Sequence, residues 1–333
     1  MCPPSEPLTT TAPAATDAAG ALDARDEPED QEVEVREAAI HRLQHGQRLD
    51  KALVALAPEF SRSWLQQLIA RGHVQLDGQV QDTASRKLKS GQRIRLALVP
   101  TAESLAFRPE TLALAIVYED AHLLVVNKPA GLVVHPAAGH WSGTLLNGLL
   151  AHHAAAATLP RAGIVHRLDK DTTGLMVVAK TLQAMTALVR QIAARDVRRI
   201  YLALAQGPVD WSELSIEAPI GRDPAARLRM AVVATGKPAR TDVVRLGGRD
   251  GVTALRCKLH TGRTHQIRVH LSWRGHALVG DLLYGGRPAL GMSRQALHAA
   301  ELAFAHPADG RTLDFSAPLP ADLAAAWALV MPA

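Results

Sequence analysis

A charged loop that runs directly into an apolar segment constrains the fold more than any other feature of this chain. Residues 166–174 read His-Arg-Leu-Asp-Lys-Asp-Thr-Thr-Gly, and residues 175–179 are all apolar. A short apolar run of this kind is typical of a buried strand. Polar groups beside a buried strand must be paired or must serve a function, because burying them without partners costs free energy. The sequence therefore predicts a functional loop next to a core strand, with Asp169 and Asp171 as the candidate carboxylates.

Two arginines near the far end of the chain are candidate partners for these acids. A carboxylate that works in a partly desolvated cleft needs a cationic neighbour to keep it ionised. Arg263 and Arg268 are the candidates, since both lie in the polar segment 261–270. A purely structural salt bridge would give the same pattern, so the residues alone leave both interpretations open.

Strand and helix patterns interleave along the chain in an irregular order. Apolar segments that predict strands include residues 201–205 and 252–259, and two strands on either side of the turn at residues 119–122 suggest a hairpin between 114 and 129. Helical spacing of apolar residues occurs in segments 145–152, 181–194 and 321–330. This order favours an α+β fold with a mixed sheet over a regular doubly wound sheet.

Composition divides the chain into a tail and a basic body. Residues 1–38 are rich in acids and poor in large apolar residues, so they cannot offset the entropy of an unfolded chain and are predicted to be disordered. The remaining residues are strongly basic, because the whole chain still carries a net charge of +5. A basic folded body suggests a polyanionic partner, although solubility alone would also explain the charge. We divide the body into a small domain, 39–102, and a larger one, 103–333.

Several classes of protein find no support in the sequence. The two cysteines, Cys2 and Cys257, exclude a disulfide framework and a cysteine metal site, and they suit a reducing cytosol. No apolar run reaches the length of a membrane span, and the N-terminus lacks the pattern of a signal peptide. His265 and His270 are five positions apart, which does not place both on one helical face as metal ligands. Phosphate-binding and dinucleotide fingerprints are also missing. We therefore expect a cytoplasmic protein with no metal and no cofactor.

The small domain combines two amphipathic segments with a hairpin signal. A first helical pattern opens at residue 47 and ends at Pro58, and a second runs from Ser61 to Gly72. Residues 74–80 alternate around an Asp-Gly pair, which predicts a hairpin. This order resembles the S4 RNA-binding domain. Its basic residues either contact RNA phosphates or are merely solvated, and we favour the phosphate contacts. The candidates are Arg48, Arg62, Arg71, Lys87 and Lys89.

Five segments in the larger domain resemble the RluA-type pseudouridine synthases. These segments are 128–136, 166–175, 199–203, 236–241 and 261–270. Together with the S4-like domain, the resemblance covers about residues 39–320, and it is closest to the RluD-type branch, with the RluC type next. It implies a catalytic domain built on a mixed, largely antiparallel sheet flanked by helices.

The resemblance also implies roles for individual residues. Asp169 matches the catalytic carboxylate, Tyr201 the tyrosine that stacks on the target base, and Arg268 the basic partner of the aspartate. Arg167 matches the residue that fills the gap left by a flipped nucleotide, whereas Asp171 and Thr172 are expected to hold the loop. Further basic residues are either RNA contacts or framework, namely Arg222, Arg229, Lys237 and Arg263.

The function implied is the isomerisation of specific uridines to pseudouridine in large-subunit (23S) ribosomal RNA. The expected substrate is the helix-69 stem-loop, in free RNA or in an assembling large subunit, modified by base flipping without any cofactor. One alternative is an RluC-type enzyme that acts on other uridines of the same RNA. Another is a non-catalytic ribosome-assembly factor that only binds RNA. A monomer without membrane association is expected in each case.

Overall fold

The computed structural model describes residues 34–99, 106–137, 139–226 and 229–331. The chain separates into two compact units, residues 1–99 and 100–333, and each is considered by itself. Most of the predicted disordered tail lies outside the described residues. None of the described helices is both long and apolar enough to cross a lipid bilayer.

The first unit packs two helices on a small antiparallel sheet. The helices are α1 (Leu49–Leu56) and α2 (Arg62–Ala70), after a short 3-10 turn η1 (Arg42–Gln44). The sheet has the order β1-β4-β2-β3, and its strands are β1 (Glu34–Ala39), β2 (Val74–Leu76), β3 (Gln79–Val80) and β4 (Arg93–Leu98). Leu49, Leu53 and Leu65 are fully buried between the two layers. Asp77 and Gly78 both have positive φ, as a two-residue hairpin turn requires, so the predicted hairpin is confirmed.

Strand β1 corrects our N-terminal boundary. Residues 34–38, which we assigned to the disordered tail, pair antiparallel with β4 along its whole length. The strand lies at the edge of the sheet and its side chains are mostly exposed. Its sequence therefore lacks the apolar alternation by which a half-buried strand is recognised.

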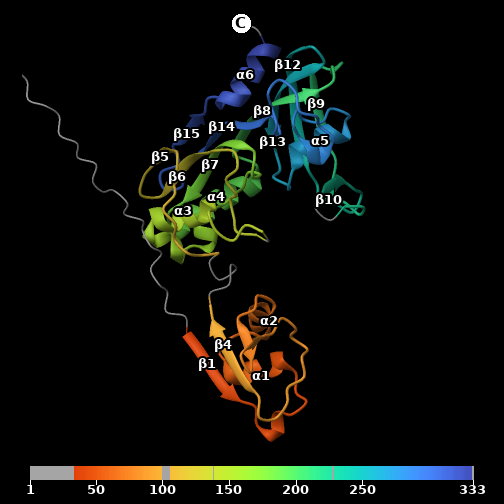
Figure 1. Cartoon of the computed structure of the whole chain (residues 1–333). Helices are drawn as coiled ribbons and strands as arrows, with labels where there is room; N and C mark the ends of the chain where they lie inside the picture. The colour runs from red at the N-terminus through yellow and green to blue at the C-terminus, as the bar shows by residue number, and fades with distance from the viewer. Residues whose placement is uncertain (1–33, 100–105, 138, 227–228, 332–333) are drawn as a thin grey trace, which may run out of the picture. The chain divides into compact units, whose positions relative to one another are not determined.

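The second unit is organised around a nine-stranded sheet among the described residues (Figure 1). The order is β5-β6-β7-β14-β8-β13-β12-β9, and β15 pairs with β14 beyond the end of β7. The bounds are β5 (Ile116–Glu119), β6 (Leu123–Lys128), β7 (Thr173–Ala179), β8 (Arg198–Gln206), β9 (Glu213–Glu217), β12 (Arg240–Arg249), β13 (Val252–Leu259), β14 (Leu297–Ala305) and β15 (Thr312–Ser316). Among the strand pairs that the structure describes, the β7–β14 pairing alone is parallel. The expected mixed, largely antiparallel sheet is confirmed.

Helices cover both faces of this sheet. Helices α3 (Leu145–His152) and α5 (Gln266–Trp273) contribute to one core, α4 (Leu182–Ala194) to a second core, and α6 (Ala321–Val330) to a third. The short elements are η2 (Ala154–Thr158), η3 (Pro160–Gly163), η4 (Leu282–Tyr284) and the hairpin β10 (Ile220–Arg222) with β11 (Met230–Val232).

Strand β7 is buried on both faces. Met176 and Val178 point into the core that contains α3, whereas Val177 and Ala179 point into the core beneath α4. This explains the unbroken apolar run, because neither face needs a polar residue. Gly174 is the second residue of the strand and has a φ of 114°, and a Cβ there would lie 2.2 Å from the carbonyl oxygen of Ala299. The glycine thus allows β7 to approach β14 directly after the charged loop.

Candidate active site

A cavity of about 570 Å³ in the second unit lies beside the charged loop. Its walls come from the loop before β7, from β8, and from the turn that leads into α5. Asp169, Tyr201 and Arg268, which are far apart in the sequence, all line it. The geometry therefore brings the three predicted catalytic residues to one site, while their catalytic roles stay predictions.

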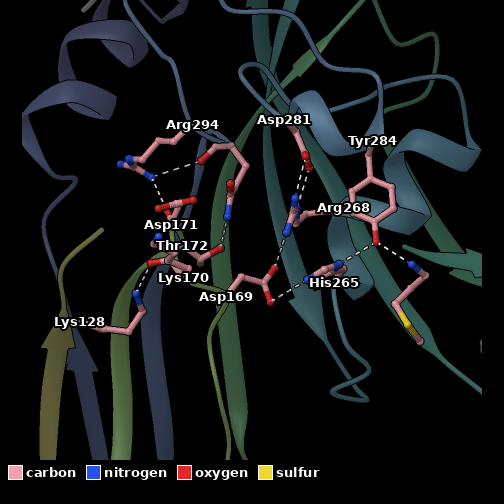
Figure 2. Close-up of polar contacts among 12 residues, drawn as sticks. Lys128, Asp169, Lys170, Asp171, Thr172, His265, Arg268, Asp281, Tyr284 and Arg294 are labelled. Carbon is pink, nitrogen blue, oxygen red and sulfur yellow. Dashed lines mark hydrogen bonds and ion pairs between the residues drawn. The ribbon is translucent and has the colours of Figure 1, made fainter. Parts of the chain in front are cut away.

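Asp169 is held by an arginine that is itself held by a second aspartate (Figure 2). Arg268 Nη1 donates to Asp169 Oδ2 at 3.0 Å, and its Nε and Nη2 donate to Asp281 at 2.7 and 2.8 Å. Burial opposes the charge of Arg268, but the hydrogen bonds to Asp281 and the nearby carboxylates raise its pKa above the ordinary value. The arginine is thus a fixed cation that orients Asp169 through a charge-assisted hydrogen bond. Sequence reasoning missed Asp281, which no motif marks.

His265 and Tyr284 form a second set of contacts on the same side of Asp169. Tyr284 Oη accepts a hydrogen bond from the Met230 amide at 3.0 Å and lies 2.7 Å from His265 Nδ1. His265 Nε2 is 3.9 Å from Asp169 Oδ1 (Figure 2). No other acceptor for the phenol hydrogen is recorded among the described residues, so the hydroxyl donates to Nδ1 and the imidazole carries its hydrogen on Nε2. Burial lowers the pKa of His265, although Asp169 opposes this shift.

The backbone at the start of α5 has an unusual conformation. The N-cap residue is His265, whose φ of 57° lies in the left-handed region. This conformation is costly for a residue with a Cβ, and such strain is concentrated at functional sites. It points the imidazole toward Asp169 instead of leaving it on the helix surface.

Three side-chain donors, from the buried Lys128 and Gln295 and the partly buried Arg294, hold the loop around Asp169. Lys128 Nζ donates to the carbonyls of Pro129, Leu132 and Lys170 at 2.8, 3.0 and 2.8 Å. Burial lowers the pKa of Lys128 to about 8, although nearby carboxylates oppose the shift. Arg294 Nη1 donates to the Asp171 carbonyl at 2.9 Å, and Gln295 Nε2 donates to Thr172 Oγ1 at 3.3 Å. The loop is therefore held through the Asp171 backbone and the Thr172 hydroxyl.

Tyr201 lies deeper in the fold than we expected. It is the fourth residue of β8, a strand paired on both sides, rather than an aromatic residue at a strand end. Its side chain is buried against the main core and lines the cavity. Burial raises the pKa of Tyr201 to about 12, so the phenol stays protonated at neutral pH. A rigid, neutral aromatic face of this kind is suited to stacking on a nucleobase.

The other basic residues predicted to contact RNA in the larger domain differ in exposure and in their contacts. Arg167 is exposed where it lines the cavity. Arg263 also lines the cavity, but its Nε donates to the Pro238 carbonyl at 3.1 Å, so it is not the partner of Asp169. Arg229 stacks over the Tyr284 ring at 5.6 Å and lies 3.7 Å from Asp223. Lys237 is exposed, and Arg222 ends β10.

In the S4 unit, two of the predicted RNA contacts share a buried acid. Arg48 and Arg62 both bind Asp50, with nitrogen–oxygen distances of 3.0 and 2.8 Å. Hydrogen bonds from Arg48, and then from Gln66 and Arg62, lower the pKa of Asp50 despite its burial. The two arginines are thus not merely solvated: they orient each other while their side chains stay about half exposed. Arg71, Lys87 and Lys89 are exposed.

Comparison with known proteins shows which family the chain resembles. The family described as RNA pseudouridylate synthase matches residues 122–273, and the S4 domain matches residues 47–94. The ribosomal large subunit pseudouridine synthase D of Neisseria meningitidis serogroup A is 51% identical over 291 residues, which cover 84% of this chain and 77% of that protein. The enzyme of the same name from Pasteurella multocida is 46% identical over 298 residues, covering 86% and 91%.

A solved structure also matches. Human RNA pseudouridylate synthase domain containing 1 has a TM-score of 0.50 and 32% identity, and the match covers 62% of this chain and 84% of that one. Fold and site define an RNA-modifying enzyme that carries an S4 domain. The chain belongs to the RNA pseudouridylate synthase family, and the family assignment made from its motifs is confirmed.

Proposed function

We propose that this enzyme converts specific uridines of large-subunit ribosomal RNA to pseudouridine, with Asp169 as the catalytic carboxylate. The observation that carries the proposal is the pairing of Asp169 with Arg268 at the wall of the cavity. The choice of RNA is supported by the relatives, which are named as large-subunit synthases. The finer substrate we propose is the helix-69 stem-loop.

The reaction begins with a uridine turned out of the RNA into the cavity. A volume of about 570 Å³ suits one nucleoside, since ligand pockets measure about 300–1,000 Å³. Extruding a base costs a few kcal/mol, and less where the RNA is already unpaired, as in a loop. Tyr201 stacks on the base, and the exposed Arg167 fills the gap that the base leaves.

Asp169 then acts on the ribose through one oxygen. Arg268 occupies Oδ2, so Oδ1 is the reactive atom, either as a nucleophile or as a base. The bond between the ribose C1′ and uracil N1 breaks, and its electron pair stays on the uracil ring. The ring turns, C5 forms the new bond to C1′, and C5 loses a proton while N1 gains one. No electrons or atoms enter from outside, so the chemistry requires no co-reactant.

The S4 unit supplies RNA affinity in this proposal. Arg71, Lys87 and Lys89 are exposed and available for phosphate contacts. We further propose that the enzyme acts as a monomer in the cytoplasm, on free RNA or on an assembling large subunit. The modified uridines are then those in unpaired loops of the RNA, where a base can be extruded into the cavity.

The test is a map of pseudouridines in ribosomal RNA from cells with and without the gene. We expect one group of sites in a large-subunit stem-loop to disappear on deletion. A plasmid with the wild-type gene should restore them, whereas one carrying Asp169→Asn should not. An unchanged map, or full restoration by the Asp169→Asn gene, would overturn the proposal.

A further inference from the structure

Arg199 is a buried cation without a partner. Its residue is only 5% exposed, and its Nε is buried without any hydrogen bond. No acceptor within hydrogen-bond distance of its guanidinium is recorded among the residues that the structure describes. A buried charge without a partner is costly, so each case needs an explanation. The mechanism given so far makes no use of this arginine.

Arg199 lies in the wall of the cavity, close to Tyr201 and Gly262, and this position suggests that it binds a ligand there. It lines the cavity and lies two residues before Tyr201 on β8, so both side chains point to the same face of the sheet. The opposite wall makes room for it, since a Cβ on Gly262 would lie 3.1 Å from Arg199 Nη1. Gly262 does not have a left-handed φ, so its backbone does not require glycine. The glycine instead leaves space for the guanidinium.

Two groups of the RNA could bind the Arg199 guanidinium, a phosphate or the flipped uracil, and the residues around the cavity favour the uracil. Exposed arginines line the cavity and are available to phosphates of the bound RNA, namely Arg161, Arg167 and Arg195. Arg199 is buried and lies on the same face of β8 as Tyr201, which is proposed to stack on the base. A base stacked on Tyr201 would lie beside this guanidinium, and the two carbonyl oxygens of uracil are good acceptors for it.

The charge of the leaving group strengthens this assignment. When the C1′–N1 bond breaks, its electron pair stays on the uracil ring, and the negative charge is shared with the ring carbonyl oxygens. A fixed cation in a cavity with little water stabilises such a developing charge more strongly than water does. Arg199 lines the cavity in which this anion is proposed to form.

We propose that Arg199 is a further catalytic residue, which binds the carbonyl oxygens of the flipped uracil and stabilises the anion formed when the ring leaves the ribose. This inference rests on the proposed function. It predicts that Arg199 acts on the rate of the chemical step and contributes little to RNA affinity.

The test compares Arg199→Met, Arg199→Lys and the wild type as full-length proteins, in single-turnover reactions on unmodified large-subunit ribosomal RNA transcribed in vitro. At saturating enzyme we expect Arg199→Met to be about 10²–10³-fold slower, the range for losing one stabiliser of a developing anion. Arg199→Lys keeps the positive charge but loses the planar set of guanidinium donors, so its rate should lie between those of Arg199→Met and the wild type. The control Arg190→Met, which removes an exposed arginine of α4, should match the wild type.

Two further measurements separate catalysis from structure. The Kd for RNA should stay within about threefold of wild type for Arg199→Met, because the outer cations supply the phosphate contacts. Its melting temperature should not fall, because methionine replaces a buried charge that has no partner. Gly262→Ala should displace the guanidinium and give a severalfold loss of rate. The double variant Arg199→Met/Gly262→Ala should be no slower than Arg199→Met.

An Arg199→Met rate within threefold of wild type would overturn the inference, and so would a slow rate accompanied by parallel losses of melting temperature and RNA affinity. Wild-type protein that forms no pseudouridine on this RNA would instead overturn the proposed function, and the inference with it. The two failures are therefore distinguishable in one experiment.

Discussion

Asp281 clamps Arg268 through two parallel hydrogen bonds of 2.7 and 2.8 Å, and this leaves Nη1 of the guanidinium for Asp169. Asp281 is almost completely buried, at 1% exposure, and lies on the far side of Arg268 from the cavity. The arginine cannot swing away from Asp169 without breaking both bonds. Asp281 is thus a positioning residue for Asp169, acting through Arg268.

Asp281→Ala should therefore lower both activity and stability. It leaves the Arg268 guanidinium buried with one partner fewer, and breaking such a buried pair costs about 3–5 kcal/mol. Urea denaturation measures this loss. The matched control is Asp314→Ala, which breaks an exposed pair with Arg198 and should cost under about 1 kcal/mol. Equal losses for the two variants would contradict the clamp.

Tyr284→Phe tests the contact between His265 and its tyrosine. It removes the hydroxyl that bridges the Met230 amide and His265 Nδ1, so stability should fall by about 1–3 kcal/mol. The rate at saturating RNA should fall as well, since the imidazole loses its fixed orientation. Tyr118→Phe also removes a hydrogen-bonded hydroxyl, but on strand β5 at the end of the sheet, so it should lower stability without changing the rate. A rate unchanged in Tyr284→Phe would exclude a role for this contact in catalysis.

Stability should decrease as the pH is lowered, because of His166. Burial, assisted by the positive charge of Arg199, lowers the pKa of His166 from 6.5 to about 3, and its Nε2 accepts a hydrogen bond from the Val177 amide. Below pH 6.5 the His166 imidazole binds a proton in the unfolded chain, whereas in the folded chain it stays neutral until about pH 3. The free energy of unfolding should therefore decrease as pH falls through this window. His166→Gln keeps an acceptor for Val177 and should show a shallower decrease, whereas identical slopes would refute the assignment.

RNA binding should weaken steeply with salt if the S4 unit contacts phosphates. Each lost phosphate contact lowers the slope of log Kd against log salt concentration by about 1. Replacing Lys87 or Lys89 by alanine should lower the slope accordingly. Asp82→Asn, which changes an exposed acid of the same unit, serves as a control and should leave the slope unchanged. An affinity independent of salt would contradict the electrostatic interpretation.

The sequence predicted those parts of the fold that depend on local patterns. The apolar run at 175–179 predicted β7, and the Asp-Gly pair predicted the hairpin in the S4 unit. It did not predict β1, whose pairing with β4 depends on residues far along the chain. Nor did it place Tyr201 in the middle of a central strand, because the length of β8 is set by its neighbours β13 and β14.

The candidate site was predictable only where motifs exist. Asp169 and Arg268 lie 99 residues apart and were paired by resemblance, whereas Asp281 and Tyr284 lie outside the segments compared. The orientation of His265 follows from a left-handed backbone that no residue type at that position signals. Arg199 lay within a recognised segment, but only the structure reveals that it is buried and has no hydrogen-bond partner among the described residues.

The most direct test of the catalytic assignment is a single-turnover measurement of Asp169→Asn alongside its RNA affinity. Asparagine keeps the shape of the side chain but can neither attack the ribose as an anion nor accept a proton from it. We predict a rate of pseudouridine formation at least about 10⁴-fold below wild type, with a Kd for RNA within about threefold. An Asp169→Asn enzyme that retains more than a tenth of the wild-type rate would contradict the assignment.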